Sequence, residues 1–515
     1  MPSRTQYSLR NAKVGAACYL LSLLVSFFSR KIFLDHLGTV FLGFTGSVGS
    51  ILGFLNIAEL GISTAVSVVL YKPLFERNQL QIDEILSILG YLYRCIGCFI
   101  LAVGVVVSFF LPVFFSDVNL PIGVIYLGYY SFLFSSLLGY FVNYRTILLS
   151  ADQRGYVVAA CSQFVTIFKV LVQIGLVYFY NSFTGYLLAE FAFGIVYSWI
   201  LNRKVRQNYP ALASDLSAGK ALLRQYPDIV TKVRQLCYHK IGAFVQNQSA
   251  PILIYSFVSL PMVALYGNYM LVTSSLRALF ARIFEQMTSS VGNLVAEGKT
   301  EHIFEVYRQL FSFRFWIASI VSCSAYWGLS PFIRLWLGQE YVLSDSISFL
   351  VCAYLFLCLL REVTDQFLYG YGLVQDVLSP VIESLIFISV SVVGGKLWGL
   401  TGILLGPLAS LVIVIFIWKP YFLFTRGFRL PVLRKYWLPF VQYLALVILS
   451  SLITTFLLSR VSLFASSDVV WTAWILRTLV SFLLFSFITL VGFSLLSKDF
   501  VSLLRRIANL SLLHS

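Results

Sequence analysis

Long apolar runs constrain this chain more than any other feature of its sequence. Fourteen such runs follow one another, separated by short polar breaks, and only 11% of the residues are charged. Soluble domains carry about a quarter charged residues, whereas a helix that crosses a bilayer needs about 20 consecutive apolar ones. The sequence therefore predicts an all-α polytopic membrane protein with about 14 transmembrane helices and no separate soluble domain. The predicted spans are residues 12–29, 38–71, 84–112, 121–149, 156–180, 183–201, 238–258, 261–285, 310–333, 346–370, 379–396, 399–424, 438–459 and 470–496.

The basic residues predict the orientation of these spans. With the N-terminus inside, 28 of the 37 Lys and Arg residues fall on inner flanks, six on outer flanks and three within spans. Basic residues collect on the cytoplasmic side of membrane proteins. We therefore expect both termini in the cytoplasm and explain the net charge of +15 without any nucleic-acid partner. The first run lacks a small-residue cleavage site and continues into Arg30-Lys31, so we expect it to be retained as a span.

The chain shows signs of an internal duplication. Stretches beginning at Gly43 and Gly267 each lead to a glutamate, Glu59 and Glu285, near the inner end of a predicted span. The following spans also agree, with an aromatic-arginine pair 18 or 17 residues before a proline. Many transporters are built from such repeats. We predict two six-helix lobes plus two added helices, divided as residues 1–234, 235–430 and 431–515.

Several stretches resemble one transporter family. SFFSRKIFLDHLG, LGFTGSVGSILGFLNIAELGISTAV, LYKPL, LLSADQRGY and SSVGNLVAEGKTE are similar to the polysaccharide transporter branch of the multidrug/oligosaccharidyl-lipid/polysaccharide (MOP) exporter superfamily. The resemblance covers essentially the whole chain. It implies a MATE-like fold and a Wzx-type flippase of the bacterial inner membrane, whose cargo is an undecaprenyl-pyrophosphate-linked oligosaccharide for O-antigen or capsule. It also implies a polysaccharide polymerase and chain-length machinery as partners. The related lipid II flippases use a Ser-Arg pair at the end of the first helix, which Ser29-Arg30 matches.

Cations inside the spans give a separate reason to expect an anionic cargo. An ionisable group at mid-membrane costs about 2.5–3.5 kcal/mol on insertion scales, so it should face protein or water and have a use. The candidates for a cationic, substrate-binding lumen are Arg30, Arg94, Lys169 and Arg361. For Arg30 and Arg94 the alternative is that they reach to a nearby interface, as long side chains do. Arg361 lies four residues before Asp365, so these two are expected to form an ion pair.

Four carboxylates are candidates for coupling or gating: Glu59, Glu285, Asp365 and Glu383. Burial raises a carboxyl pKa, so Glu59 and Glu285 could take up a proton during transport. They could equally cap helix breaks or bind a basic residue. The sequence Glu59-Leu-Gly61 also indicates an interrupted helix at this point.

Other functions receive less support. Gly292 and Gly298 are separated by five residues rather than the four of a phosphate-binding loop, so ATP-driven transport is not expected. Asp35 and His36 could serve a membrane glycosyltransferase or polymerase, but the predicted outer loops are short for such an enzyme. A multidrug/cation antiporter of the same superfamily remains an alternative. We expect no enzymatic activity, no catalytic residue, no cofactor and no metal site.

Overall fold

The computed structural model describes residues 4–59, 61–116, 118–152, 154–285, 287–373, 379–431, 433–460 and 470–513, and within these ranges every regular element is a helix. They form two compact units, residues 1–264 and 265–515. The first unit contains α1 (Arg4–Leu55), η1 (Asn56–Glu59), α2 (Ile62–Glu76), α3 (Gln79–Phe114), α4 (Ile122–Phe141), η2 (Tyr144–Thr146), α5 (Ile147–Ala151), α6 (Gly155–Tyr180), α7 (Phe183–Asn208), α8 (Gly219–Leu222) and α9 (Pro227–Phe257). Helix α10 (Leu260–Glu285) begins in the first unit and continues into the second. The second unit contains α11 (Met287–Ala296), α12 (Thr300–Trp336), η3 (Gln339–Tyr341), α13 (Asp345–Gly370), α14 (Ser379–Ser410), η4 (Leu411–Trp418), α15 (Lys419–Phe422), η5 (Leu423–Phe428), η6 (Leu433–Trp437), α16 (Leu438–Arg460), α17 (Trp471–Leu496) and α18 (Lys498–Leu513).

Helix α1 is longer than expected. The sequence predicts a loop over residues 30–37, but the helix continues through them and departs from helical geometry only at Gly38, where φ is +77°. Glycine adopts this backbone conformation at little cost because it has no Cβ. The predicted interruption near Gly61 is confirmed, since α1 ends at Leu55, η1 follows, and α2 begins after Gly61 with φ of +90°.

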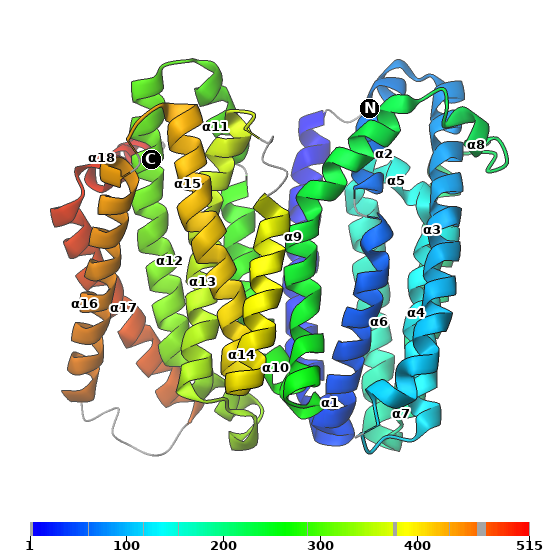
Figure 1. Ribbon diagram of the computed structural model, residues 1–515, viewed down its shortest axis with the longest axis horizontal. Helices are drawn as coiled ribbons and strands as arrows, with labels where there is room; N and C mark the ends of the chain where they lie inside the picture. Colours follow the sequence, from blue (N-terminus) through cyan, green and yellow to red (C-terminus); the bar gives the residue numbers. More distant parts are fainter. Residues whose placement is uncertain are drawn as a thin grey trace. The chain divides into compact units, whose positions relative to one another are not determined.

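In the first unit, α1 packs against α6, α9 and α4, while α3 packs against α4 and α2 (Figure 1). Its core gathers Phe44, Leu86, Leu89, Tyr129 and Leu133, all fully buried. Helices α6 and α7 form a tight hairpin. Asn181 ends α6 in a left-handed conformation, and the Ser182 side chain accepts a hydrogen bond from the amide of Gly185 at the start of α7.

In the second unit, α12 is the central helix and contacts α13, α17 and α18. Aromatic side chains fill its core: Tyr307 packs edge-to-face on Phe367 and Phe424, and Phe311 packs against Tyr436. Helix α14 departs from helical geometry at Trp398 and Gly399, between the two spans predicted there. The three-part division with boundaries at 234 and 430 stays a prediction.

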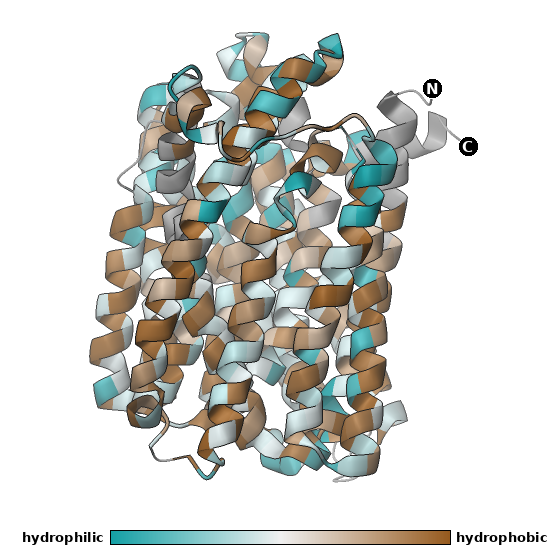
Figure 2. Cartoon of the chain, turned by 90° about the vertical axis from the view of Figure 1, so that its right-hand side faces the viewer, coloured by the Kyte–Doolittle hydropathy of each residue, from teal (hydrophilic) through white to brown (hydrophobic). Residues whose placement is uncertain are grey.

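Ten helical stretches in the described part are long and apolar enough to cross a bilayer. Two of them, 17–55 and 379–428, contain the departures from helical geometry at Gly38 and at Trp398 and Gly399. Hydrophobic residues cover the middle of the helices and hydrophilic residues gather towards their ends (Figure 2). The chain is therefore a multi-pass membrane protein, and the count of fourteen spans stays a prediction.

Candidate functional site

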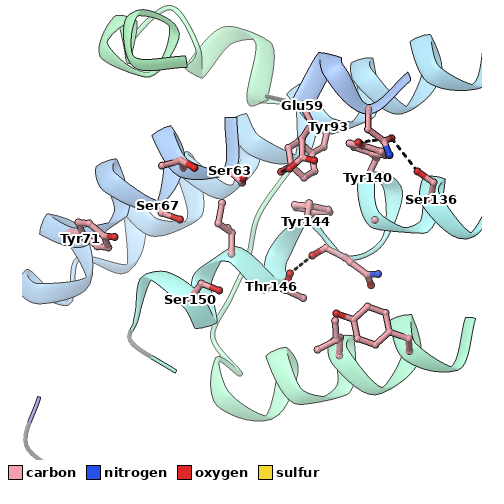
Figure 3. A pocket seen from close by; sticks show the side chains of 17 residues that line it. Glu59, Ser63, Ser67, Tyr71, Tyr93, Ser136, Tyr140, Tyr144, Thr146 and Ser150 are labelled. Carbon is pink, nitrogen blue, oxygen red and sulfur yellow. Dashed lines mark hydrogen bonds between the residues drawn. The ribbon is translucent and has the colours of Figure 1, made fainter. Parts of the chain in front are cut away.

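A polar cavity of about 630 Å³ lies inside the first unit, where η1 and α2 face α3, α4, α5 and α7 (Figure 3). Fourteen of its 17 lining residues carry a hydroxyl, amide or carboxylate group. They are Asn56, Glu59, Ser63, Thr64, Ser67, Tyr71, Tyr93, Ser136, Tyr140, Asn143, Tyr144, Thr146, Ser150 and Tyr197, and the other three are Gly139, Ile147 and Leu201.

The helix break at Gly61 builds one wall of this cavity. Glu59 lies in the 3₁₀ turn before the break, and Ser63, Ser67 and Tyr71 follow on α2 at four-residue intervals. Residues four apart share one face of a helix. The left-handed Gly61 joins the two segments so that Glu59 and the α2 stripe line the same space.

Hydrogen bonds hold the inner end of the cavity in place. The Tyr93 hydroxyl donates to Oε1 of Glu59 at 2.7 Å. The side-chain oxygen of Asn56 accepts from Tyr140 at 3.0 Å and from Ser136 at 3.1 Å. Glu59 is thus a fixed acceptor at one end of a lining made largely of hydroxyls.

This chemistry suits a neutral, hydroxyl-rich ligand. Hydroxyl and amide groups can both donate and accept hydrogen bonds, and tyrosine rings offer flat surfaces. Glu59 is the sole charged residue among the 17 that line the cavity, and none of them is basic. The cavity therefore suits sugar hydroxyls or a cation better than it suits a phosphate group.

The predicted lumen cation Lys169 has a partner that the sequence analysis did not assign. Its ammonium group on α6 lies 2.7 Å from Oε1 of Glu190 on α7, and the two side chains are 21% and 15% exposed. Gln173 donates to the other carboxylate oxygen at 3.3 Å. The sequence analysis gave Lys169 no counter-ion, and the structure supplies one because α7 brings a carboxylate to the same depth.

The structure does not bring the other predicted cations of this unit together. Arg30 on α1 is half-buried and donates to the carbonyl of Ala264 at 2.9 Å. Arg94 is exposed on α3, beside the exposed residues Cys95 and Phe99. The two arginines and Lys169 lie on three different helices.

In the second unit, the expected pair of Arg361 and Asp365 is present at 3.3 Å, and it belongs to a larger network. Asp365 also binds the ammonium group of Lys419 at 2.6 Å, and Arg361 lies 3.9 Å from buried Glu383. These residues come from α13, α14 and α15. Three of the predicted site residues therefore meet in one cluster.

A second ion pair lies in the same unit and was not predicted. Arg314 on α12 is 3% exposed, lies 2.9 Å from Glu362 and stacks on Phe284 with its guanidinium carbon 3.5 Å from the ring centroid. Arg277 on α10 lies 3.8 Å from the sulfur of Cys358 and, within the described part of the chain, has no carboxylate within 4 Å. The side chain of Glu285, a predicted gating residue, lies outside the described residues.

Comparisons with known proteins bear on the fold. By sequence, no protein-family model and no curated protein matches the chain. By structure, it is similar to the lipid II flippase MurJ in an inward closed conformation, with a TM-score of 0.62 and 14% identity over 92% of this chain and 97% of that one. It is also similar to a multidrug resistance MATE family transporter of the MOP superfamily, inward-facing, with a TM-score of 0.57 and 14% identity over 80% of this chain and 97% of that one. For the eukaryotic MATE transporter AtDTX14 the TM-score is 0.51 at 13% identity, over 82% and 97%.

The fold is therefore similar to that of the lipid II flippase MurJ and of MATE transporters. The expected all-helical, MATE-like architecture is confirmed at this level.

Proposed function

We propose that this protein is a transporter that moves a lipid-linked oligosaccharide across a membrane by alternating access. The observation that carries the proposal is the cavity of the first unit, because its hydroxyl and amide lining offers many hydrogen-bond partners to a sugar head group. Buried polar groups that lack partners are costly. A cavity with 14 polar lining residues therefore favours a polar ligand over an apolar drug.

The likeness to solved structures supports the same proposal. The flippase is matched over 92% of this chain, whereas the inward-facing multidrug resistance MATE family transporter is matched over 80%. The flippase therefore accounts for a larger share of this chain's helices. The cargo that fits this likeness and the family resemblance is an undecaprenyl-pyrophosphate-linked oligosaccharide at a bacterial inner membrane, with both termini in the cytoplasm. A polysaccharide polymerase and chain-length machinery are proposed partners.

A pyrophosphate needs cations along its path, and two arginines are the best placed for this role. Arg30 is proposed because it follows Ser29 at the end of the first predicted span, the position of the Ser-Arg pair that the resemblance singles out, and its guanidinium donates to the Ala264 carbonyl at 2.9 Å. Arg277 lies next to a thiol rather than a carboxylate. Lys169 and Arg361, in contrast, each lie within 4 Å of a carboxylate of their own unit, and their contact with cargo would have to compete with that ion pair.

Glu59 is the proposed coupling residue, since it is the only ionisable carboxylate that lines the cavity. Glu59 would bind a proton or cation at one stage of the cycle and the cargo at another, and this alternation would link an ion gradient to transport. Asp365 and Glu383 are ion-paired in the second unit, which favours a gating role through that network over direct ion binding.

The alternative is a multidrug/cation antiporter, favoured by the likeness to MATE transporters and by the single carboxylate in the cavity. Depletion of the protein distinguishes the two. An oligosaccharide transporter should leave lipid-linked oligosaccharide that resists impermeant periodate in intact spheroplasts and reacts after lysis. An antiporter should leave this pool unchanged and raise sensitivity to cationic drugs, which would overturn the proposal.

A pair of variants tests the cavity itself. Ser67→Trp fills the cavity with an indole ring and should abolish export of the oligosaccharide. Val68→Trp adds the same ring at the next residue of α2, where the side chain is 42% exposed and does not line the cavity. Equal export by the two variants, at equal amounts in the membrane, would remove the cavity from the transport path.

A further inference from the structure

A second hollow of about 770 Å³ lies on the outer side of α4 and α7, and its lining divides into two kinds of surface. Leu138, Val142, Ile195 and Trp199 form an apolar wall, and Trp199 is 61% exposed. Arg203 and Arg206 lie at one end of this wall. We call this hollow the α4–α7 groove.

The two arginines of the groove carry uncompensated charge. Both are exposed, and in the described part of the chain neither has a carboxylate within 4 Å. The guanidinium carbon of Arg203 lies 5.5 Å above the ring of Trp199, a cation–π contact that holds the charge next to the apolar wall. An arginine presents up to five N–H donors in a planar fork that matches phosphate oxygens.

The position of the arginines along α7 places them at the depth of lipid head groups. Helix α7 begins at Phe183, and 20 residues at 1.5 Å each bring Arg203 about 30 Å further along its axis. The hydrocarbon core of a bilayer is about 30 Å thick. When the start of α7 lies at one interface, Ile195 therefore falls within the hydrocarbon and Arg203 and Arg206 fall at the opposite head-group layer. Exposed Trp199 lies just inside this level, where tryptophan is enriched in membrane proteins.

The floor of the groove is fixed by hydrogen bonds between the two helices. Asn143 donates to the Ser198 hydroxyl at 2.9 Å, and Asn202 donates to Asn143 at 3.3 Å and to the carbonyl of Ser198 at 2.8 Å. The amide nitrogens of Asn143 and Asn202 are thus held by protein partners, and the arginines are the charged groups that line the groove. Asn143 also lines the polar cavity, so the groove and the cavity lie on opposite sides of the contact between Asn143 and Ser198.

We infer that the α4–α7 groove is a binding site for an anionic phospholipid of the surrounding bilayer. Arg203 and Arg206 bind the phosphate group, and an acyl chain lies along Leu138, Val142, Ile195 and Trp199. Basic pockets between transmembrane helices bind anionic lipid head groups in this way. This site is separate from the cargo cavity and does not depend on which cargo the protein carries.

Native mass spectrometry of the purified protein with phosphatidylglycerol or phosphatidylcholine tests the inference. The wild-type chain should bind at least one phosphatidylglycerol more tightly than phosphatidylcholine. The double variant Arg203→Gln, Arg206→Gln should weaken that binding by roughly thirtyfold, because each basic residue near the head groups contributes about fivefold. The matched control Lys220→Gln, Arg224→Gln removes the same charge from exposed residues that do not line the groove.

A second measurement locates the acyl chain. Phosphatidylglycerol with brominated acyl chains should quench tryptophan fluorescence in the wild-type protein, and Trp199→Phe should remove a defined part of that quenching. Equal binding of the two lipids, equal loss in the arginine and control variants, or a lipid-free dimer whose interface buries Trp199 would each overturn the assignment.

Discussion

The ion pair between Lys169 and Glu190 gives the sharpest test of how this fold tolerates charge within the membrane. Glu190→Gln leaves the Lys169 ammonium group near the middle of α6 with an amide in place of its counter-ion. Breaking a buried ion pair costs 3–5 kcal/mol, and the side chains here are about four-fifths buried, so we expect a loss of about 3 kcal/mol, or roughly 150-fold in the unfolding equilibrium. Lys169→Met should cost about 2 kcal/mol, because Gln173 still donates to the remaining Glu190 carboxyl group.

The double variant decides whether the two charges act together. Lys169→Met, Glu190→Gln removes both charges and should cost about 1 kcal/mol or less, which against the two single losses gives a coupling free energy of about 4 kcal/mol. Unfolding in mixed micelles, followed by tryptophan fluorescence, measures all four proteins of the cycle. If the two single losses simply add in the double variant, the pair is not coupled and the reasoning is wrong.

The chain offers a matched control for this cycle. Lys31 and Asp35 form a pair of the same kind at 3.4 Å, but their side chains are 47% and 45% exposed. Exposed ion pairs contribute about 0.2–1 kcal/mol. The same cycle at these positions should therefore give a coupling energy near the lower end of that range.

Three further predictions concern separate parts of the molecule. Glu59→Gln keeps an oxygen to accept from Tyr93 but removes the charge from the cavity, so export should lose its response to an ion gradient while the amount of protein in the membrane is unchanged. Gly43→Ala should destabilise the first unit by about 2 kcal/mol in a thermal unfolding assay, because a Cβ there would overlap the Leu260 carbonyl oxygen. Asp365→Asn should destabilise the second unit more than Lys419→Met, since the former leaves Arg361 and Lys419 with Glu383 alone, which contacts only Arg361, whereas the latter leaves Arg361 in contact with both Asp365 and Glu383.

Each of these predictions has a reference variant or an outcome that contradicts it. Gly49→Ala lies on the same helix as Gly43 with nothing within 4 Å of the new Cβ, so it should be neutral or slightly stabilising. Gradient-driven export that survives Glu59→Gln would exclude a coupling role for this carboxylate. Equal stability of Asp365→Asn and Lys419→Met would show that the network of the second unit does not depend on charge balance.

The sequence predicts the helices well because they depend on local properties. Apolar runs of 18 or more residues identify most of them, and the glycine of Glu59-Leu-Gly61 correctly indicated the break between η1 and α2. The predicted loop at residues 30–37 was wrong because polar residues such as Arg30 and Asp35 are common at span ends, yet they do not interrupt helical backbone geometry.

The site was harder to predict because it depends on which helix faces meet. Lys169 and Glu190 are 21 residues apart, and only the tight turn at Asn181 and Ser182 brings them to the same depth. The cavity, in contrast, had a signal in the sequence. Ser63, Ser67 and Tyr71 recur every four residues on one face of an apolar helix, and Glu59 precedes them at the same interval, before the break. This polar stripe indicates a solvated or ligand-binding face without the need for any homologue.

Two of the ion pairs, Lys169–Glu190 and Arg314–Glu362, also have a consequence for how the chain enters the membrane. Lys169 and Glu190 lie on α6 and α7, which are consecutive and joined by only two residues, and Arg314 and Glu362 lie on the consecutive long helices α12 and α13. Each charge therefore meets its counter-ion within a single helical hairpin. A hairpin that leaves the insertion machinery as a unit can carry its charges already neutralised, so neither helix has to wait in lipid for a partner from a later part of the chain.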